Sequence, residues 1–318
     1  MDFAEVEQAR RLLRDLLPAT RLVPAPSLSR FSGAEVYLKL ENEAPTGSFK
    51  VRGAFNAVYH ESERGPLAGV VTSSTGNHGA AVAYVARRMG LPATVFLPEH
   101  PNPIKRARIA ELGATIFEAG RDYDEAREHA ARYARDHGWF FVEDGRNPDL
   151  TSGAATIGCE VVEQLPRADV IYVPVGDTTL IRGVAFAAKH LSPKVRVIGV
   201  QAERAPAYYQ SWKEQRVIHT DTCDTIADGL AVRCPVEDNV RELRELVDEM
   251  RLVSEAAMLE AIYRLLAHEH TVAEPAGAAA TAAFLGSSQV HAGEKVVLLV
   301  TGSNLVAEVL RQAVLAHS

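Results

Sequence analysis

Cysteine is scarce in this sequence, and long apolar runs are absent. The three cysteines, Cys159, Cys223 and Cys234, form no C-x-x-C pair, and an odd, scattered set is typical of reduced thiols in the cytoplasm. No apolar stretch approaches the roughly 20 residues that a membrane-spanning helix requires. The N-terminal segment has the pattern of a charged amphipathic helix, not that of a signal peptide. We therefore expect a cytoplasmic protein that does not bind membranes.

Several binding motifs are also missing. A net charge of −7 without a dense cluster of lysine and arginine argues against a nucleic-acid partner. The chain has neither a G-x-G-x-x-G loop nor a Walker A loop, which disfavours an NAD or ATP site. The run His268–His270 lacks the i, i+4 spacing of a zinc-binding H-E-x-x-H helix, and we expect no metal site.

What the sequence does contain is a regular alternation of strand-like and helix-like segments. Apolar β-rich runs each precede a helical pattern, at residues 70–72, 93–97, 115–117, 170–175, 195–200 and 295–300. This β-α-β-α order predicts parallel sheets covered by helices, an α/β fold. No internal repeat or long linker interrupts it.

Lys50 lies where one of these strands gives way to a helix. The apolar run 36–40 is followed by a break at 45–47, and the helical pattern restarts at Lys50. Its neighbours Phe49 and Val51 could lower the pKa of the amine, because desolvation disfavours the ammonium form. A neutral amine at such a junction suits a Schiff-base enzyme. The alternative is a surface lysine whose apolar stem lies on the edge of the core.

Three further junctions carry small polar residues. They are Ser73–Gly79, Gly176–Leu180 and Thr301–Asn304, each following an apolar strand. Helix N-termini at such positions bind anions through free N–H groups and the helix dipole, although each turn alone could be an ordinary helix cap. Together with Lys50, the three turns predict a ligand with several polar ends.

Two of these motifs, Pro45–Lys50 and Ser74–His78, together closely resemble the fold-type II pyridoxal-phosphate enzymes, in the threonine dehydratase and serine racemase branch. The resemblance continues through Leu91–Pro98, Lys105, Leu112–Ala114, Thr225–Leu230 and Glu274–Ala279. It implies two domains, each with a mostly parallel twisted sheet flanked by helices. Residues 1–60 and 147–318 would form a large cofactor-binding domain, and residues 61–146 a small domain for the substrate carboxylate. It also implies a homodimer.

The same resemblance assigns roles to individual residues. Lys50 would bind pyridoxal 5'-phosphate covalently and act as the base at Cα, with Thr75 as a second catalytic residue. The cofactor would contact Phe49, Lys50, Asn77, Gly176, Asp177, Thr178, Thr179, Leu180, Glu274 and Thr301. An amino-acid substrate would contact Ser74, Thr75, Gly76, Asn77, His78, Gly145 and Ala155. The Thr301 hydroxyl would face the pyridine nitrogen without keeping it protonated, which favours loss of a β leaving group.

The sequence also departs from the family pattern. Asp177, Thr178 and Thr179 replace three glycines of the phosphate turn, and a carboxylate ~6 Å from a phosphate charge would cost roughly 3 kcal/mol at an effective dielectric of ~20. Gly145 stands where relatives often have a bulky residue, which predicts room for a larger β substituent, such as the aryl group of phenylserine, unless Phe141 or Trp139 fills the space. Gln201 and Ala207 replace the two carboxylates of metal-activated relatives.

From these residues we predict a pyridoxal-phosphate-dependent lyase, a dehydratase or ammonia-lyase that converts a β-hydroxy-α-amino acid into a 2-oxo acid and ammonia. An amino-acid racemase of the same fold is an alternative, because Thr75 offers a hydroxyl where related racemases have a serine. β-Replacement is a second alternative. A non-catalytic binding protein that has lost the cofactor through Asp177 is a third.

Overall fold

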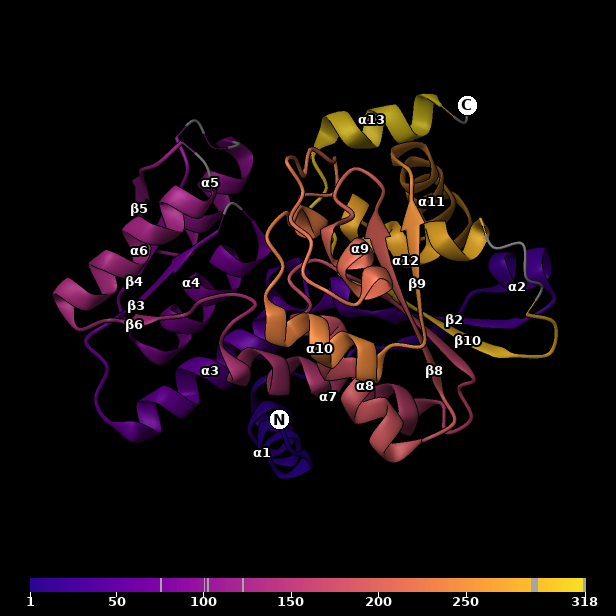
Figure 1. Cartoon of the computed structure of the whole chain (residues 1–318), viewed down its shortest axis with the longest axis horizontal. Coiled ribbons are helices and arrows are strands. Elements are labelled where there is room, and N and C mark those ends of the chain that lie inside the picture. The colour runs from indigo at the N-terminus through magenta and orange to yellow at the C-terminus, as the bar shows by residue number, and fades with distance from the viewer. Residues whose placement is uncertain (75, 100, 102, 122, 287–290, 317–318) are drawn as a thin grey trace. The chain divides into compact units, whose positions relative to one another are not determined.

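The structure is a computed structural model that describes residues 1–318 apart from 75, 100, 102, 122, 287–290 and 317–318. Contacts within the chain divide it into two compact units (Figure 1). The first consists of Met1–Pro18 and Ser48–Gly153, and the second of Ala19–Gly47 and Ala154–Ser318.

The first unit is built around four parallel strands in the order β5-β4-β3-β6. The strands are β3 (Val70–Ser73), β4 (Ala93–Leu97), β5 (Thr115–Glu118) and β6 (Phe140–Phe141). The helices are α1 (Phe3–Leu16), α3 (Lys50–Arg64), α4 (Asn77–Met89), α5 (Pro103–Glu111), α6 (Tyr123–His137) and the first part of α7 (Pro148–Gln164). Every residue of β4 is buried, as expected for a parallel strand covered on both faces.

In its described residues the second unit contains six strands in the order β1-β2-β10-β7-β8-β9, and the edge pair β1 and β2 is antiparallel whereas the other neighbours are parallel. The strands are β1 (Leu22–Pro24), β2 (Glu35–Leu40), β7 (Val170–Pro174), β8 (Arg196–Ala202), β9 (Glu249–Val253) and β10 (Lys295–Val300). The helices are α2 (Pro26–Ser32), the rest of α7, α8 (Thr179–Leu191), α9 (Ala207–Glu214), α10 (Glu237–Leu246), α11 (Glu255–Glu269), α12 (Pro275–Leu285) and α13 (Ala307–Leu315). Short 3₁₀ helices occur at Glu41–Glu43, Pro45–Gly47 and Asp228–Leu230.

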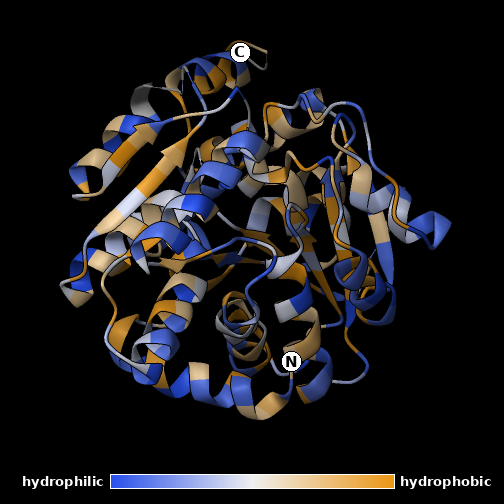
Figure 2. Cartoon of the chain, turned by 60° about the vertical axis from the view of Figure 1, so that its left-hand side comes forward, coloured by the Kyte–Doolittle hydropathy of each residue, from blue (hydrophilic) through white to orange (hydrophobic). Residues whose placement is uncertain are grey.

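Helix α12 forms the centre of the second unit. It is buried from Pro275 to Phe284 and packs on β7, β8, β9 and β10. Its sequence is alanine-rich and apolar on every side, which is the pattern of a helix without a solvent face. In Figure 2 the strands are mainly orange, whereas many of the outer helices carry both orange and blue residues. The buried start of α12 fixes Glu274, the residue directly before it.

The predicted α/β fold with mostly parallel sheets is confirmed. The predicted boundaries after residues 60 and 146 differ from the division into compact units, because α3 packs on α1 and α4 within the first unit. The assignment of a cofactor domain and a substrate domain stays a prediction. Within the described residues, none of the helices has the length and apolarity needed to cross a membrane.

Candidate active site

Lys50 is the first residue of α3, directly after a sharp turn. Thr46 and Gly47 both have positive φ, 72° and 70°, and the turn is held in the second unit by segment 301–304. There Ser303 N–H donates to Gly47 O (2.9 Å) and Asn304 Nδ2 donates to Thr46 O (3.0 Å). The junction predicted from sequence therefore exists, with a helix that begins at the lysine itself.

The Lys50 amine has a carboxylate partner that the sequence did not reveal. Its Nζ lies 2.5 Å from Oδ2 of Asp144, and both side chains are only 14% exposed. Phe49 adds an aromatic contact, with its ring centre 5.2 Å from the same nitrogen. An opposite charge at this distance favours the ammonium form, against the neutral amine expected from apolar neighbours alone. The sequence feature that could have indicated this partner is the position of Asp144, an acidic residue shortly after the apolar run at 140–142.

The predicted carboxylate site lies between β3 and α4. Ser74 Oγ accepts the N–H of Gly76 (3.2 Å), and α4 begins at Asn77. A Cβ on Gly79 would lie 3.0 Å from Ser74 O, so the turn is packed closely against the helix. His78 is buried and its Nε2 lies 3.0 Å from Val142 O. Thr75 lies outside the described residues. Backbone N–H groups at this helix start can bind an anion.

Gly145 occupies a turn that a larger residue would strain. Its φ is +74°, and its N–H donates to Oδ1 of Asp144 (3.2 Å). Trp139 packs edge-on to Tyr133 and against Gly69, where a Cβ would lie 2.6 Å from the indole. Phe141 belongs to the same apolar cluster. Both aromatic side chains are thus engaged in the core of the first unit. Ala155, on α7, is fully buried in the second unit.

In the second unit, segment 176–180 leads from β7 into α8. Asp177 folds back onto its own turn, and its Oδ1 accepts the Thr179 N–H (2.8 Å). Thr178 has a left-handed φ of 77°, and its hydroxyl accepts from Arg182 Nε (3.1 Å). The buried Thr179 hydroxyl has no hydrogen-bond partner among the described residues. The Asp177 side chain therefore occupies one backbone N–H of the helix start, that of Thr179, whereas the Thr179 hydroxyl remains available for a ligand.

Close backbone contacts occur at glycines beside the predicted cofactor residues of the second unit. A Cβ on Gly176 would lie 2.2 Å from Gly229 O, and a Cβ on Gly277 would lie 2.4 Å from Gly302 O. Glu274 N–H donates to Gly302 O (2.9 Å), which places Glu274 beside the segment that begins at Thr301. Both Glu274 and Thr301 are buried. No side chain fits at these crossings, so the backbones themselves are in contact.

These features fit the phosphate of a pyridoxal-type cofactor. A buried hydroxyl without a partner among the described residues at the start of α8 offers a hydrogen-bond donor, and the first-turn N–H groups and helix dipole favour an anion. The negative charge of the Asp177 carboxylate repels an anion at this position. Nearby, burial raises the pKa of Tyr208, whose oxygen accepts from Val236 N–H (3.1 Å) and Asn239 Nδ2 (3.4 Å).

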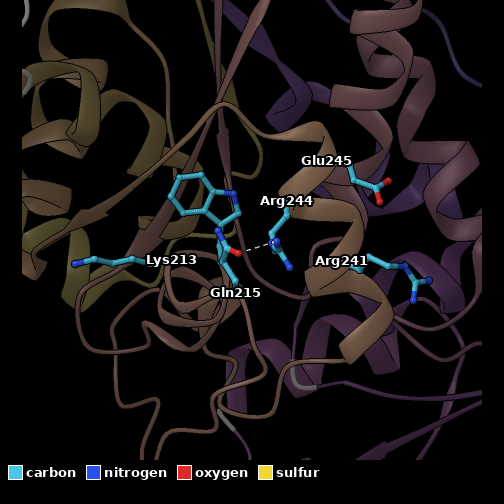
Figure 3. Close-up of a pocket in the computed structure, with 6 residues that line it drawn as sticks. Lys213, Gln215, Arg241, Arg244 and Glu245 are labelled. Carbon is cyan, nitrogen blue, oxygen red and sulfur yellow. Dashed lines mark hydrogen bonds between the residues drawn. The ribbon is translucent and has the colours of Figure 1, made fainter.

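Gln201 and a pocket are two further features of the second unit. Gln201 is buried on β8, and its Oε1 accepts the Tyr209 N–H (2.8 Å), so this glutamine supports α9. Within the described ranges, no group of three or more His, Cys, Asp or Glu side chains could hold a metal ion. A pocket of about 400 Å³ on the second unit is lined by Trp212, Lys213, Gln215, Arg241, Arg244 and Glu245 (Figure 3). None of these six is a predicted site residue.

Comparison with known proteins identifies the family. The family described as pyridoxal-phosphate dependent enzyme matches residues 13–302. The chain belongs to this family. An L-threonine ammonia-lyase from Thermotoga maritima is 39% identical over 95% of this chain and 75% of the relative. A catabolic L-threonine dehydratase, TdcB, from Staphylococcus aureus is 33% identical over 96% of this chain and 89% of the relative.

Solved structures of this pyridoxal-phosphate family agree. Maize serine racemase superposes with a TM-score of 0.92 at 29% identity, covering 99% of this chain and 97% of that one. The T.th. threonine deaminase superposes with a TM-score of 0.90 at 31% identity, covering 96% and 99%. The predicted fold type, the threonine dehydratase and serine racemase branch, the lyase class and the cofactor pyridoxal 5'-phosphate are confirmed. The roles of individual site residues stay predictions.

Proposed function

We propose that this enzyme removes water and then ammonia from a β-hydroxy-α-amino acid, giving a 2-oxo acid. One observation carries the proposal: the Lys50 amine stands at the predicted strand-to-helix junction of a chain that is 39% identical to an L-threonine ammonia-lyase. Similarity to threonine dehydratases supports the same reaction type. The family resemblance further supports a homodimer in the cytoplasm, which sedimentation and cell fractionation would test.

The side chains divide the work as follows. Bound pyridoxal phosphate supplies an electron sink that makes the Cα proton of an amino acid acidic. Lys50 Nζ takes that proton, and N–H groups at the start of α4 orient the substrate carboxylate. The start of α8 would hold the phosphate, with the Thr179 hydroxyl as a hydrogen-bond donor. The Thr301 hydroxyl would donate a hydrogen bond to the ring nitrogen but, unlike an aspartate carboxylate, would not keep it protonated, which would favour departure of the β-hydroxyl over transamination.

We propose further that the β substituent is bulky, with 3-phenylserine as the test compound. The turn at Gly145 supports this, because its positive φ disfavours the large side chain that relatives often carry there. The alternative was that Trp139 or Phe141 fills the space. Both instead pack in the apolar cluster around Phe96 and Ala134, which supports the more open site. Pocket space changes the discrimination between two substrates by only about 1–3 kcal/mol per methylene, so we expect the enzyme to accept a broad range of β substituents.

A racemase is the second candidate, because maize serine racemase is as similar in fold as the threonine deaminase. One assay separates the two. Purified protein is incubated with the L-isomers of serine, threonine and 3-phenylserine, and both 2-oxo acid and D-isomer are quantified. The proposal predicts 2-oxo acid as the main product. A D-isomer formed in large excess over 2-oxo acid would favour the racemase.

A further inference from the structure

Asp144 contacts two ionisable groups through one oxygen. Its Oδ2 lies 2.5 Å from Lys50 Nζ on α3 and 3.8 Å from His78 Nδ1 on α4. Its other oxygen, Oδ1, accepts the Gly145 N–H. All of these groups belong to the first unit. Asp144 therefore joins the reactive amine to a histidine that is only 3% exposed.

The surroundings fix the tautomer of His78. Its Nε2 lies 3.0 Å from Val142 O, and a carbonyl oxygen can only accept, so Nε2 carries a proton. In the neutral imidazole Nδ1 is then an acceptor. That nitrogen is buried, has no hydrogen-bond partner among the described residues, and lies 3.8 Å from the carboxylate oxygen, which is beyond hydrogen-bonding distance. Two acceptors that face each other in a buried site are favourable only with a proton between them.

Other charged groups near this segment are paired with one another. Glu143 is bonded by Arg127 of α6 (2.8 Å) and lies 3.2 Å from Arg146. Asp149 lies 3.0 Å from Nδ1 of His60 on α3. The Lys50 amine and, when protonated, the His78 ring are two cationic groups that face Asp144 within the described residues.

We propose that Lys50, Asp144 and His78 form a proton relay. The inference rests on the proposed role of Lys50. The ammonium of Lys50 passes one proton to Asp144 Oδ2, which leaves a neutral amine and a carboxylic acid. The O–H of this carboxylic acid then donates a hydrogen bond to His78 Nδ1. The reverse transfer returns the proton to Lys50, so charge and protons balance. Asp144 touches the reacting nitrogen and is the catalytic member, and His78 is a positioning residue.

The central test is Asp144→Asn. The amide has nearly the same shape as the carboxylate but cannot accept the proton from the Lys50 ammonium. In the cofactor-free full chain, removal of the carboxylate destabilises the ammonium, so Lys50 is neutral at lower pH and captures pyridoxal phosphate several-fold faster at neutral pH. In the loaded enzyme, turnover falls about 10²-fold because the proton has no acceptor. Faster capture with slower turnover is a combination that simple structural damage does not produce.

Asp149→Asn is the matched control, because Asp149 also pairs with a histidine but does not touch Lys50. It should change neither capture nor turnover. The relay is overturned if Asp144→Asn leaves both rates unchanged, or if both rates fall together. His78→Gln keeps a donor for Val142 O and should lower turnover and alter its pH profile; a wild-type profile would remove His78 from the relay.

Lys50→Ala separates this proposal from the one on which it rests. Loss of covalent cofactor capture in Lys50→Ala, seen by mass spectrometry after borohydride reduction, supports the role of Lys50 whatever Asp144→Asn does. Capture at the wild-type level in Lys50→Ala would refute that role and the relay with it.

Discussion

Replacing Gly53 with alanine should destabilise the protein and disturb Lys50. Gly53 lies on α3 one turn after Lys50, and a Cβ there would be 2.8 Å from Leu150 O and 3.1 Å from Leu150 Cα. Alanine in an open helix would gain up to about 1 kcal/mol over glycine. Overpacking costs about 1–3 kcal/mol, and these neighbours are backbone atoms that cannot rotate away. The cost of the clash should exceed the gain in helix propensity, so the free energy of unfolding should fall by a net amount on the order of 1–2 kcal/mol.

Gly65→Ala is the control on the same helix. It caps the C-terminus of α3 in extended backbone, and a Cβ there would have nothing within 4 Å. Urea unfolding should show a lower midpoint for Gly53→Ala and an unchanged or slightly higher one for Gly65→Ala. Cofactor capture should slow only in Gly53→Ala, because α3 and α7 must separate beside Lys50. A Gly53→Ala midpoint at or above wild type would refute the close helix crossing.

Three further predictions concern the site. Lys50→Ala should lose the visible absorbance of the bound cofactor and at least ~10³ in turnover; unchanged turnover would end the assignment. Asp177→Asn keeps an acceptor for the Thr179 N–H but removes the charge, so the cofactor should bind up to about 10²-fold tighter, whereas weaker binding would contradict the repulsion. A chelator should leave activity unchanged, because Gln201 and Ala207 supply no carboxylate; a loss that Mg²⁺ restores would contradict this.

Much of the fold could be predicted from the sequence because its signals are local. Apolar runs such as 93–97 and 170–174 are buried parallel strands, and the polar turns at 73–79 and 176–180 are helix starts. The third predicted turn, 301–304, is not a helix start, because the next helix begins only at Ala307. Lys50 was found in the same way, as the residue where a helical pattern restarts. Such signals come from periodicity and turn chemistry over a few residues.

The contacts that were missed depend on distant parts of the chain. Asp144 lies 94 positions after Lys50, and no local pattern announces that the two side chains meet. The division into compact units depends likewise on α3 packing against α1 and α4. The sequence did flag Asp177 as a difficulty. The position of its carboxylate, which accepts the Thr179 N–H, depends on a backbone turn with Thr178 in a left-handed conformation, which is uncommon for threonine.

The most direct test of the proposed reaction is a product balance. Purified protein with pyridoxal phosphate is incubated with L-threonine, L-serine and L-3-phenylserine, and 2-oxo acid and ammonia are measured against substrate consumed, with Lys50→Ala in parallel. We expect equal amounts of 2-oxo acid and ammonia from at least one of these substrates, and neither product from Lys50→Ala. Substrate consumption without ammonia, or equal product from Lys50→Ala, would contradict it.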